Sequence, residues 1–191
     1  MTARLDLLTH GATTANRVAS FSADEPLEPS AVAALKAARG RLKPYGRVLV
    51  APERAARDSA AALGYEGDIA PTLKDCDYGR WRGLALMDVA KREPEALGLW
   101  LDDPAAAPHG GESFAAVLGR VAAWLAQEQT RSGTTLAVTH APVVRAAIVS
   151  ALGASPAAFW RIDAAPLFLT RLAGHDGRWN LVSFSPLGSG A

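Results

Sequence analysis

Apolar residues gather in short runs along this chain, separated by polar and glycine-rich stretches. Residues 46–51 are a nearly continuous apolar run, and residues 4–9 and 134–139 also have the pattern of strands; all three predict strands of a sheet. Between the segments 4–9 and 46–51, residues 29–43 carry alanine and leucine at helical spacing. A strand, a crossover helix and a second strand indicate a parallel pair.

The spacing of apolar residues is helical in four further segments, and strands are indicated again near the end of the chain. The predicted helices cover residues 53–63, 86–100, 113–129 and 143–152. Residues 167–172 and 179–184 flank the glycine-rich turn 174–177 and predict a terminal hairpin. Together these elements predict an α/β fold, a three-layer α/β/α sandwich with a mainly parallel sheet and helices on both faces.

The length and charge of the chain narrow the class of protein. Its 191 residues fit one domain, which we place at residues 1–185, with residues 186–191 as a flexible tail. Twenty Lys and Arg against nineteen Asp and Glu leave a formal charge of +1, so no overall field favours nucleic acid or a membrane surface. No segment approaches the ~20 apolar residues of a membrane helix. The only cysteine, Cys76, cannot form an internal disulfide, which favours a reducing compartment, and we expect a cytoplasmic protein.

Two histidines directly follow predicted parallel strands. His10 comes after the run at residues 4–9, and His140 comes after the run at residues 134–139. The carboxyl ends of parallel strands form the crevice where open α/β sheets usually bind ligands. A single histidine in such a place is more often a hydrogen-bonded structural residue. Two of them, with a glycine and a helix start beside them, indicate a shared site.

The residues around these histidines resemble the motifs of a known family. The segment 9–13, Thr-His-Gly-Ala-Thr, is similar to the Arg-His-Gly-x-Thr signature of the histidine phosphatase (phosphoglycerate mutase-like) superfamily. Further matches follow in the family's order, and the one at residues 110–113 resembles the alpha-ribazole phosphatase-like branch. They are Asn16, Ala51-Pro52 with Ser59-Ala60, Leu73 to Gly83, Gly110-Gly111-Glu112-Ser113 with Arg120, and Val138 to Arg145. The resemblance implies a phosphoglycerate mutase-like fold.

The resemblance also implies phosphoryl transfer without a metal or another cofactor. His10 would attack phosphorus as a neutral imidazole and form a phosphohistidine, and His140 would donate to the phosphate as a charged imidazolium. Asp75 matches the family's catalytic glutamate and would protonate the leaving alkoxide. Glu112 is a second candidate for this acid. Each carboxylate also has a plainer interpretation, Asp75 as a surface acid on a loop and Glu112 as a cap of the following helix.

The chain departs from the family at the two arginines that hold the phosphate. Thr9 and Ala55 stand in their places. An arginine–phosphate contact is a charge-assisted pair worth ~1.5 to 3 kcal/mol, so two uncompensated losses would leave a feeble enzyme. Three other arginines are candidate substitutes, although each could equally be a solvent-facing residue. The predicted substrate-binding residues are therefore Thr9, Gly11, Asn16, Arg17, Arg54 and Arg57.

These observations favour hydrolysis of a small phosphomonoester through a phosphohistidine. The branch resemblance alone suggests alpha-ribazole 5'-phosphate, an intermediate of cobalamin biosynthesis, as the substrate. The alternative is a pseudoenzyme that keeps both histidines and binds a phosphorylated or carboxylated ligand without turnover. A third interpretation has no ligand and uses the surface to bind a partner protein. The sequence leaves the oligomeric state open, a homodimer included.

Overall fold

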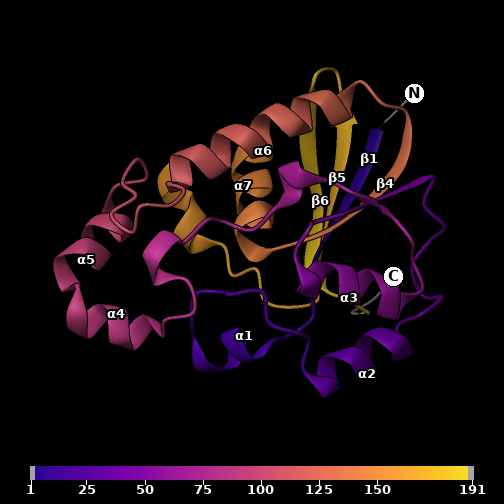
Figure 1. Ribbon diagram of the computed structural model, residues 1–191. Helices are drawn as coiled ribbons and strands as arrows, with labels where there is room; N and C mark the ends of the chain where they lie inside the picture. The colour runs from indigo at the N-terminus through magenta and orange to yellow at the C-terminus, as the bar shows by residue number, and fades with distance from the viewer. Residues whose placement is uncertain (1–2, 189–191) are drawn as a thin grey trace.

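A six-stranded mixed sheet forms the centre of the molecule. The computed structural model describes residues 3–188, and its strands lie in the order β3-β2-β4-β1-β5-β6 (Figure 1). The first four in this order are parallel, and β5 and β6 run antiparallel at one edge. The strands are β1 Ala3–Thr9, β2 Arg47–Val50, β3 Asp68–Ile69, β4 Gly133–Thr139, β5 Phe168–His175 and β6 Arg178–Pro186.

Helices lie on both faces of this sheet, so the predicted three-layer α/β/α fold is confirmed (Figure 1). The α-helices are α1 Thr14–Val18, α2 Pro29–Ala37, α3 Arg54–Leu63, α4 Leu86–Arg92, α5 Pro94–Asp102, α6 Phe114–Gln129 and α7 Ala141–Leu152. Three 3-10 helices are η1 Pro71–Leu73, η2 Gly79–Trp81 and η3 Pro156–Arg161. Within residues 3–188, no helix is both long enough and apolar enough to cross a membrane.

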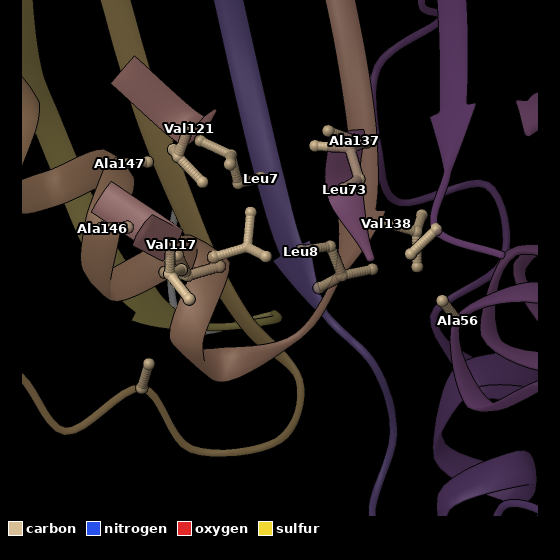
Figure 2. Packing of buried hydrophobic residues seen from close by; sticks show 14 of the residues in the cluster. Leu7, Leu8, Ala56, Leu73, Val117, Val121, Ala137, Val138, Ala146 and Ala147 are labelled. Atoms are coloured by element: carbon tan, nitrogen blue, oxygen red, sulfur yellow. The ribbon is translucent and has the colours of Figure 1, made fainter. Parts of the chain in front are cut away.

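Consecutive residues of a central strand pack into the apolar layers on opposite faces of the sheet. Leu7 and Leu8 follow each other on β1 and therefore point to opposite faces of the sheet. Leu8 is in register with Val138 of β4. Figure 2 shows Leu7 beside Val121 of α6, whereas Val138 lies beside Ala56 of α3. All of these side chains are fully buried, so both faces of the sheet are covered, and its carboxyl edge is where polar groups can converge.

One predicted helix is wrong. Residues 86–100 form two helices, α4 and α5, which meet at Glu93. Pro94 has no N–H to continue the hydrogen-bond ladder, and its ring disfavours helical geometry at the preceding residue. Glu93 accordingly has φ −136° and ψ 54°, and the chain changes direction there.

The end of the chain is more ordered than predicted. The terminal hairpin is confirmed, and its strands continue to the pair of His175 and Arg178. The predicted tail begins too early, because Pro186 is the last residue of β6 and the N–H of Leu187 donates to the carbonyl of Leu167. The last part of that tail, residues 189–191, lies outside the described residues.

A glycine-rich loop holds the segment that carries Asp75. The N–H of Glu112 donates to the carbonyl of Asp77 at 2.7 Å, and the thiol of Cys76 donates to the carbonyl of Glu112 at 3.4 Å. Gly111 lies so close to this segment that a Cβ there would overlap the carbonyl oxygen of Asp77. The position of Asp75 therefore depends on a close approach that glycine permits.

We predict that Gly111→Ala destabilises the protein by about 1 to 3 kcal/mol, because the added methyl group forces the loop away from Asp77. Gly119→Ala is the matched control, since a Cβ at Gly119 in α6 meets no atom within 4 Å. Alanine should even stabilise that helix by ~1 kcal/mol. Urea unfolding measures both variants. Equal stability of the two would mean that the loop adjusts freely and does not fix Asp75.

Candidate active site

His10 lies directly after β1, and its ring is oriented by its own neighbour. The Nδ1 atom is 2.7 Å from the carbonyl oxygen of Gly11. A carbonyl oxygen only accepts, so in the neutral ring Nδ1 carries the proton and Nε2 keeps its lone pair. The backbone N–H of His10 donates to the carbonyl of Thr139, which fixes the end of β1 beside β4. The nitrogen of His10 that keeps a free lone pair is therefore Nε2.

His140 is the N-cap residue of α7 and lies against His10, with their ring centroids 4.9 Å apart. Its Nε2 is 2.9 Å from a carboxylate oxygen of Glu53, and its Nδ1 is 3.6 Å from a carboxylate oxygen of Asp75. Burial opposes charge on this ring, but the two carboxylates outweigh burial and raise the pKa of His140 above its ordinary value of 6.5. His140 is therefore the member of the pair whose surroundings favour the protonated ring.

Burial and the contact with His140 keep the ring of His10 neutral. Burial and the charge on His140 lower the pKa of His10 from 6.5 to about 4, against the opposing effects of the Gly11 carbonyl and Glu53. Two imidazoles in contact within the protein interior do not readily carry charge together. The pair therefore divides its roles, one ring neutral and the other charged.

Asp75 is a partly buried carboxyl group on the loop after η1, and its side chain is 14% exposed. Burial raises its pKa above the usual range, outweighing the charge of His140 and the N–H of Cys76, which donates to Oδ1 at 2.8 Å. A carboxyl group with a raised pKa can hold a proton and release it, as a general acid must. The structure brings this candidate acid to the histidine pair.

Glu53 is a site residue that the sequence motifs do not indicate. It is the N-cap residue of α3, and its Oε1 accepts from the N–H of Asp75 at 3.2 Å while its Oε2 contacts His140. Burial opposes ionisation, but the hydrogen bond with His140 lowers the pKa of Glu53, so this carboxyl is ionised. The available signal was its position, since an acid two residues after the run at 46–51 lies at the same edge of the sheet as the histidines.

Thr9 and Gly11 have structural contacts at the end of β1. The buried Thr9 hydroxyl donates to the carbonyl of Ala165 at 2.6 Å and accepts from the N–H of Phe168 at 2.8 Å. The N–H of Gly11 donates to the hydroxyl of Ser59 at 2.9 Å. These bonds tie the end of β1 to the chain entering β5 and to α3, and the substrate-binding roles of Thr9 and Gly11 stay predictions.

The three candidate arginines lie on the surface of the described chain. Arg17 pairs with Glu28 at 2.8 Å, and Arg54 pairs with Asp58 at 3.3 Å. Arg57 is exposed. Within residues 3–188, no contact joins any of the three to the histidine pair. The prediction that one of them replaces a lost phosphate arginine stays a prediction, and Arg17 and Arg54 would have to leave their surface partners to do so.

Glu112 holds the loop that carries Asp75. Both of its carboxylate oxygens accept from Arg120, at 2.7 and 3.1 Å. Arg120 also donates to the carbonyls of Thr72 and Asp75. Both carboxylate oxygens are engaged by one guanidinium, which favours a structural role for Glu112, and its role as proton donor stays a prediction.

Asn16 keeps hydrogen-bond donors for a ligand. Its Oδ1 accepts from the N–H of Thr13 at 2.9 Å and from the Thr13 hydroxyl at 3.1 Å. The amide nitrogen on the other side of the group retains its two N–H donors. The side chain of Asn16 lines a cavity next to the first turns of α7.

The site thus contains two histidines and two carboxylates, and it lacks the two phosphate-binding arginines of the family pattern. Positive potential for an anion comes from His140 and from the first turn of α7, where no side chain caps the N–H groups. Among residues 3–188, no three or more His, Cys, Asp or Glu side chains are grouped so that they could hold a metal ion.

An α/β sheet with paired histidines at the ends of adjacent parallel strands defines the class of the protein. The chain belongs to the histidine phosphatase superfamily (branch 1), whose family model matches residues 5–185.

Individual relatives agree with this placement. The chain is 31% identical over 172 residues to the bifunctional protein Rv2228c of Mycobacterium tuberculosis, which covers 83% of this chain and 47% of the relative. It therefore spans about half the length of that protein. It is 30% identical over 154 residues to the glucosyl-3-phosphoglycerate phosphatase of Mycolicibacterium vanbaalenii, covering 67% and 68%. An Escherichia coli protein assigned as an alpha-ribazole-5'-P phosphatase has the same fold, with a TM-score of 0.87 at 22% identity over 99% of this chain and 98% of that chain.

We predict that His10 makes the folded protein less stable in acid. Its pKa is about 4 in the folded protein against an ordinary value of 6.5, so between these pH values the unfolded chain binds more protons. The stabilising contribution is complete above pH 6.5 and is lost as the pH falls to 4, by up to about 3 kcal/mol. Urea unfolding should show a shallower fall in the free energy of unfolding for His10→Gln than for the wild type.

His175→Gln is the control for this measurement, because His175 is exposed at the end of the β5–β6 hairpin. That variant should keep the wild-type dependence on pH. A wild-type dependence in His10→Gln would contradict a neutral, buried His10.

Proposed function

We propose that this chain is a phosphomonoesterase that hydrolyses a small phosphate ester through a phosphohistidine on His10. The observation that carries the proposal is the division of charge within the histidine pair. His10 has a free Nε2 lone pair, and His140 beside it carries a proton. A nucleophile and a cationic donor for the same phosphate thus lie in contact, with ring centroids 4.9 Å apart.

The reaction proceeds in two steps at phosphorus. Nε2 of His10 attacks in line, the P–N bond forms, and the P–O bond to the leaving group breaks while Asp75 gives its proton to the leaving alkoxide. A water molecule then attacks the phosphohistidine while Asp75 takes a proton from it. The P–N bond breaks, inorganic phosphate leaves, and His10 returns to its neutral state with Asp75 protonated again.

This site offers fewer positive charges to a phosphate than the family pattern does. His140 and the N-terminal turn of α7 provide the positive potential, and Asn16 provides N–H donors. Loss of one donor to the transition state typically lowers a rate by ~10² to 10³, so we expect turnover well below that of an arginine-bearing relative. A substrate that gains binding energy from its organic part suits such a site best.

The substrate itself is proposed at the level of a class, a small organic phosphomonoester. Alpha-ribazole 5'-phosphate is one candidate, supported by the motif at residues 110–113. Glucosyl-3-phosphoglycerate is a second candidate, because the relative from Mycolicibacterium vanbaalenii bears that phosphatase name. We also propose that the protein works in the cytoplasm, where the buried free thiol of Cys76 is stable, as a monomer or a homodimer.

A second candidate function is ligand binding without turnover, and Glu53 favours it. Its carboxylate oxygen contacts Nε2 of His140 at 2.9 Å, and a phosphate oxygen would need that same donor. A phosphate dianion must displace this negative charge, whereas a carboxylate with a single charge meets less repulsion. The ligand would then be a phosphorylated or carboxylated molecule held between the histidines.

Hydrolysis of alkyl and 4-nitrophenyl phosphates by the wild type and two variants tests the proposal. His10→Ala should abolish turnover, because it removes the nucleophile. Asp75→Asn should slow the alkyl phosphate by ~10²-fold or more and affect 4-nitrophenyl phosphate far less, because nitrophenolate leaves without a proton. His175→Ala and Asp176→Asn are the matched controls, since both residues are exposed, and they should behave as wild type.

Three results would change the account. Unchanged turnover in His10→Ala would refute the mechanism. Equal losses on both esters would remove the acid role from Asp75. Binding of an ester by the wild type without any hydrolysis would leave the binding protein as the function.

A further inference from the structure

A cavity of about 430 Å³ with mostly aromatic and aliphatic walls lies beside the first turns of α7. We call it the aromatic cavity, and its size suits an organic ligand with a ring. Phe21, Trp100, Phe114 and Trp160 are among its lining residues. Trp160 is 37% exposed, so part of the wall faces solvent and a ligand has a way in.

Two structural links join the aromatic cavity to the site. Pro142 and Arg145 line the cavity, and both belong to α7, the helix whose N-cap residue is His140. Tyr78 lines the aromatic cavity and also a second cavity of about 240 Å³, which Glu53 and Asp75 line. A phosphate held at His140 would therefore have its organic part directed to the aromatic cavity.

Arg145 is a charged group without a partner in this cavity. Its Nε atom is buried and has no hydrogen-bond partner in residues 3–188, and its guanidinium forms no ion pair there. Burial lowers the pKa of Arg145, while Tyr78 and Asp163 oppose that effect, and an arginine remains charged at neutral pH. The guanidinium lies over the ring of Phe159, with 5.7 Å from Cζ to the ring centroid.

We propose that the aromatic cavity binds the organic part of the substrate and that Arg145 pairs with a carboxylate on it. Arg145 is partly buried and has no ion pair or hydrogen bond in residues 3–188, and an anionic ligand that reaches it gains a charge-assisted, bidentate interaction. A single guanidinium among apolar walls matches the single charge of a carboxylate better than a second dianionic phosphate. This inference rests on the proposed function, because it assigns the substrate class of the same site.

The helix separates the two sites that would hold anionic groups. Arg145 follows His140 by five positions in sequence, which corresponds to about 7.5 Å along the axis of α7 and about 140° around it. One aromatic ring between a phosphate and a carboxylate spans a separation of this order, and the aromatic walls favour such a ring. The substrate class is therefore a phosphomonoester with a flat, mostly apolar body that carries a carboxylate at its far end.

Binding of two phosphonates that cannot be hydrolysed tests this inference apart from catalysis. The pair is benzylphosphonate and 4-carboxybenzylphosphonate, in which a methylene group replaces the ester oxygen, and calorimetry measures their affinities. The wild type should bind the carboxylated compound about tenfold or more tightly. Arg145→Met should weaken that compound by about 10- to 100-fold and change benzylphosphonate by no more than about twofold. Arg145→Lys should keep part of the preference.

The matched control is Arg161→Met, which removes the same charge from an exposed position on η3 and should bind both phosphonates as the wild type does. Equal affinity of the wild type for the two phosphonates would overturn the inference. An equal loss of both in Arg145→Met would also overturn it, because Arg145 would then hold the phosphonate. If Arg145→Met does not fold, the wild type and Arg145→Lys still decide the question.

If the proposed function is wrong but the inference is right, the hydrolysis and binding experiments give a different set of results. In that case the wild type hydrolyses neither phenyl phosphate nor 4-carboxyphenyl phosphate, while the calorimetric preference for the carboxylated phosphonate remains. Hydrolysis of both esters at the same kcat/KM, without any preference in binding, would leave the function in place and refute the role of Arg145.

Discussion

His10 and His140 lie with their ring centroids 4.9 Å apart, and two imidazoles this close inside a protein hold one positive charge far more easily than two. The structure decides which ring is charged. Glu53 and Asp75 flank His140, whereas the Nδ1 of His10 faces a neutral carbonyl. The chemistry proposed for the site follows from this asymmetry, since the same two rings with the charge reversed would have no nucleophile.

The surrounding elements serve to keep this arrangement in place. β1 and β4 bring the two rings to one edge of the sheet, and α3 begins with the carboxylate that pairs with His140. Arg120 is a partly buried arginine in this region, yet it binds Glu112 and the carbonyl of Asp75 and so fixes the acid loop. Glu53 adds a negative charge beside His140, so a phosphate dianion that binds there must either displace this carboxylate or lie next to it. The site therefore favours a substrate that brings binding energy from outside the phosphate.

Much of the fold could be predicted from the sequence because short segments rich in apolar residues alternate with segments of helical spacing. The break at Pro94 was missed because the apolar spacing continues across it, although the proline itself marked the boundary. His10, His140 and Asp75 could be found because the motifs keep their order.

Contacts between distant segments could not be predicted in the same way. Glu53 meets His140 across 87 positions in sequence, and Thr9 meets the chain near β5 across 156. Arg145 was visible as part of a motif, but its lack of a partner is a property of the folded cavity. Spacing in the sequence indicates which residue types are available, whereas only packing indicates which of them are already paired.

The ring nitrogens of the histidines report the central claim directly. Nitrogen-15 NMR of the histidine-labelled protein at pH 7, assigned with single His→Gln variants, should show His10 with one protonated nitrogen, Nδ1, and one free nitrogen, Nε2. His140 should show both nitrogens protonated. A doubly protonated His10, or a neutral His140, at that pH would contradict the division of charge from which the mechanism is derived.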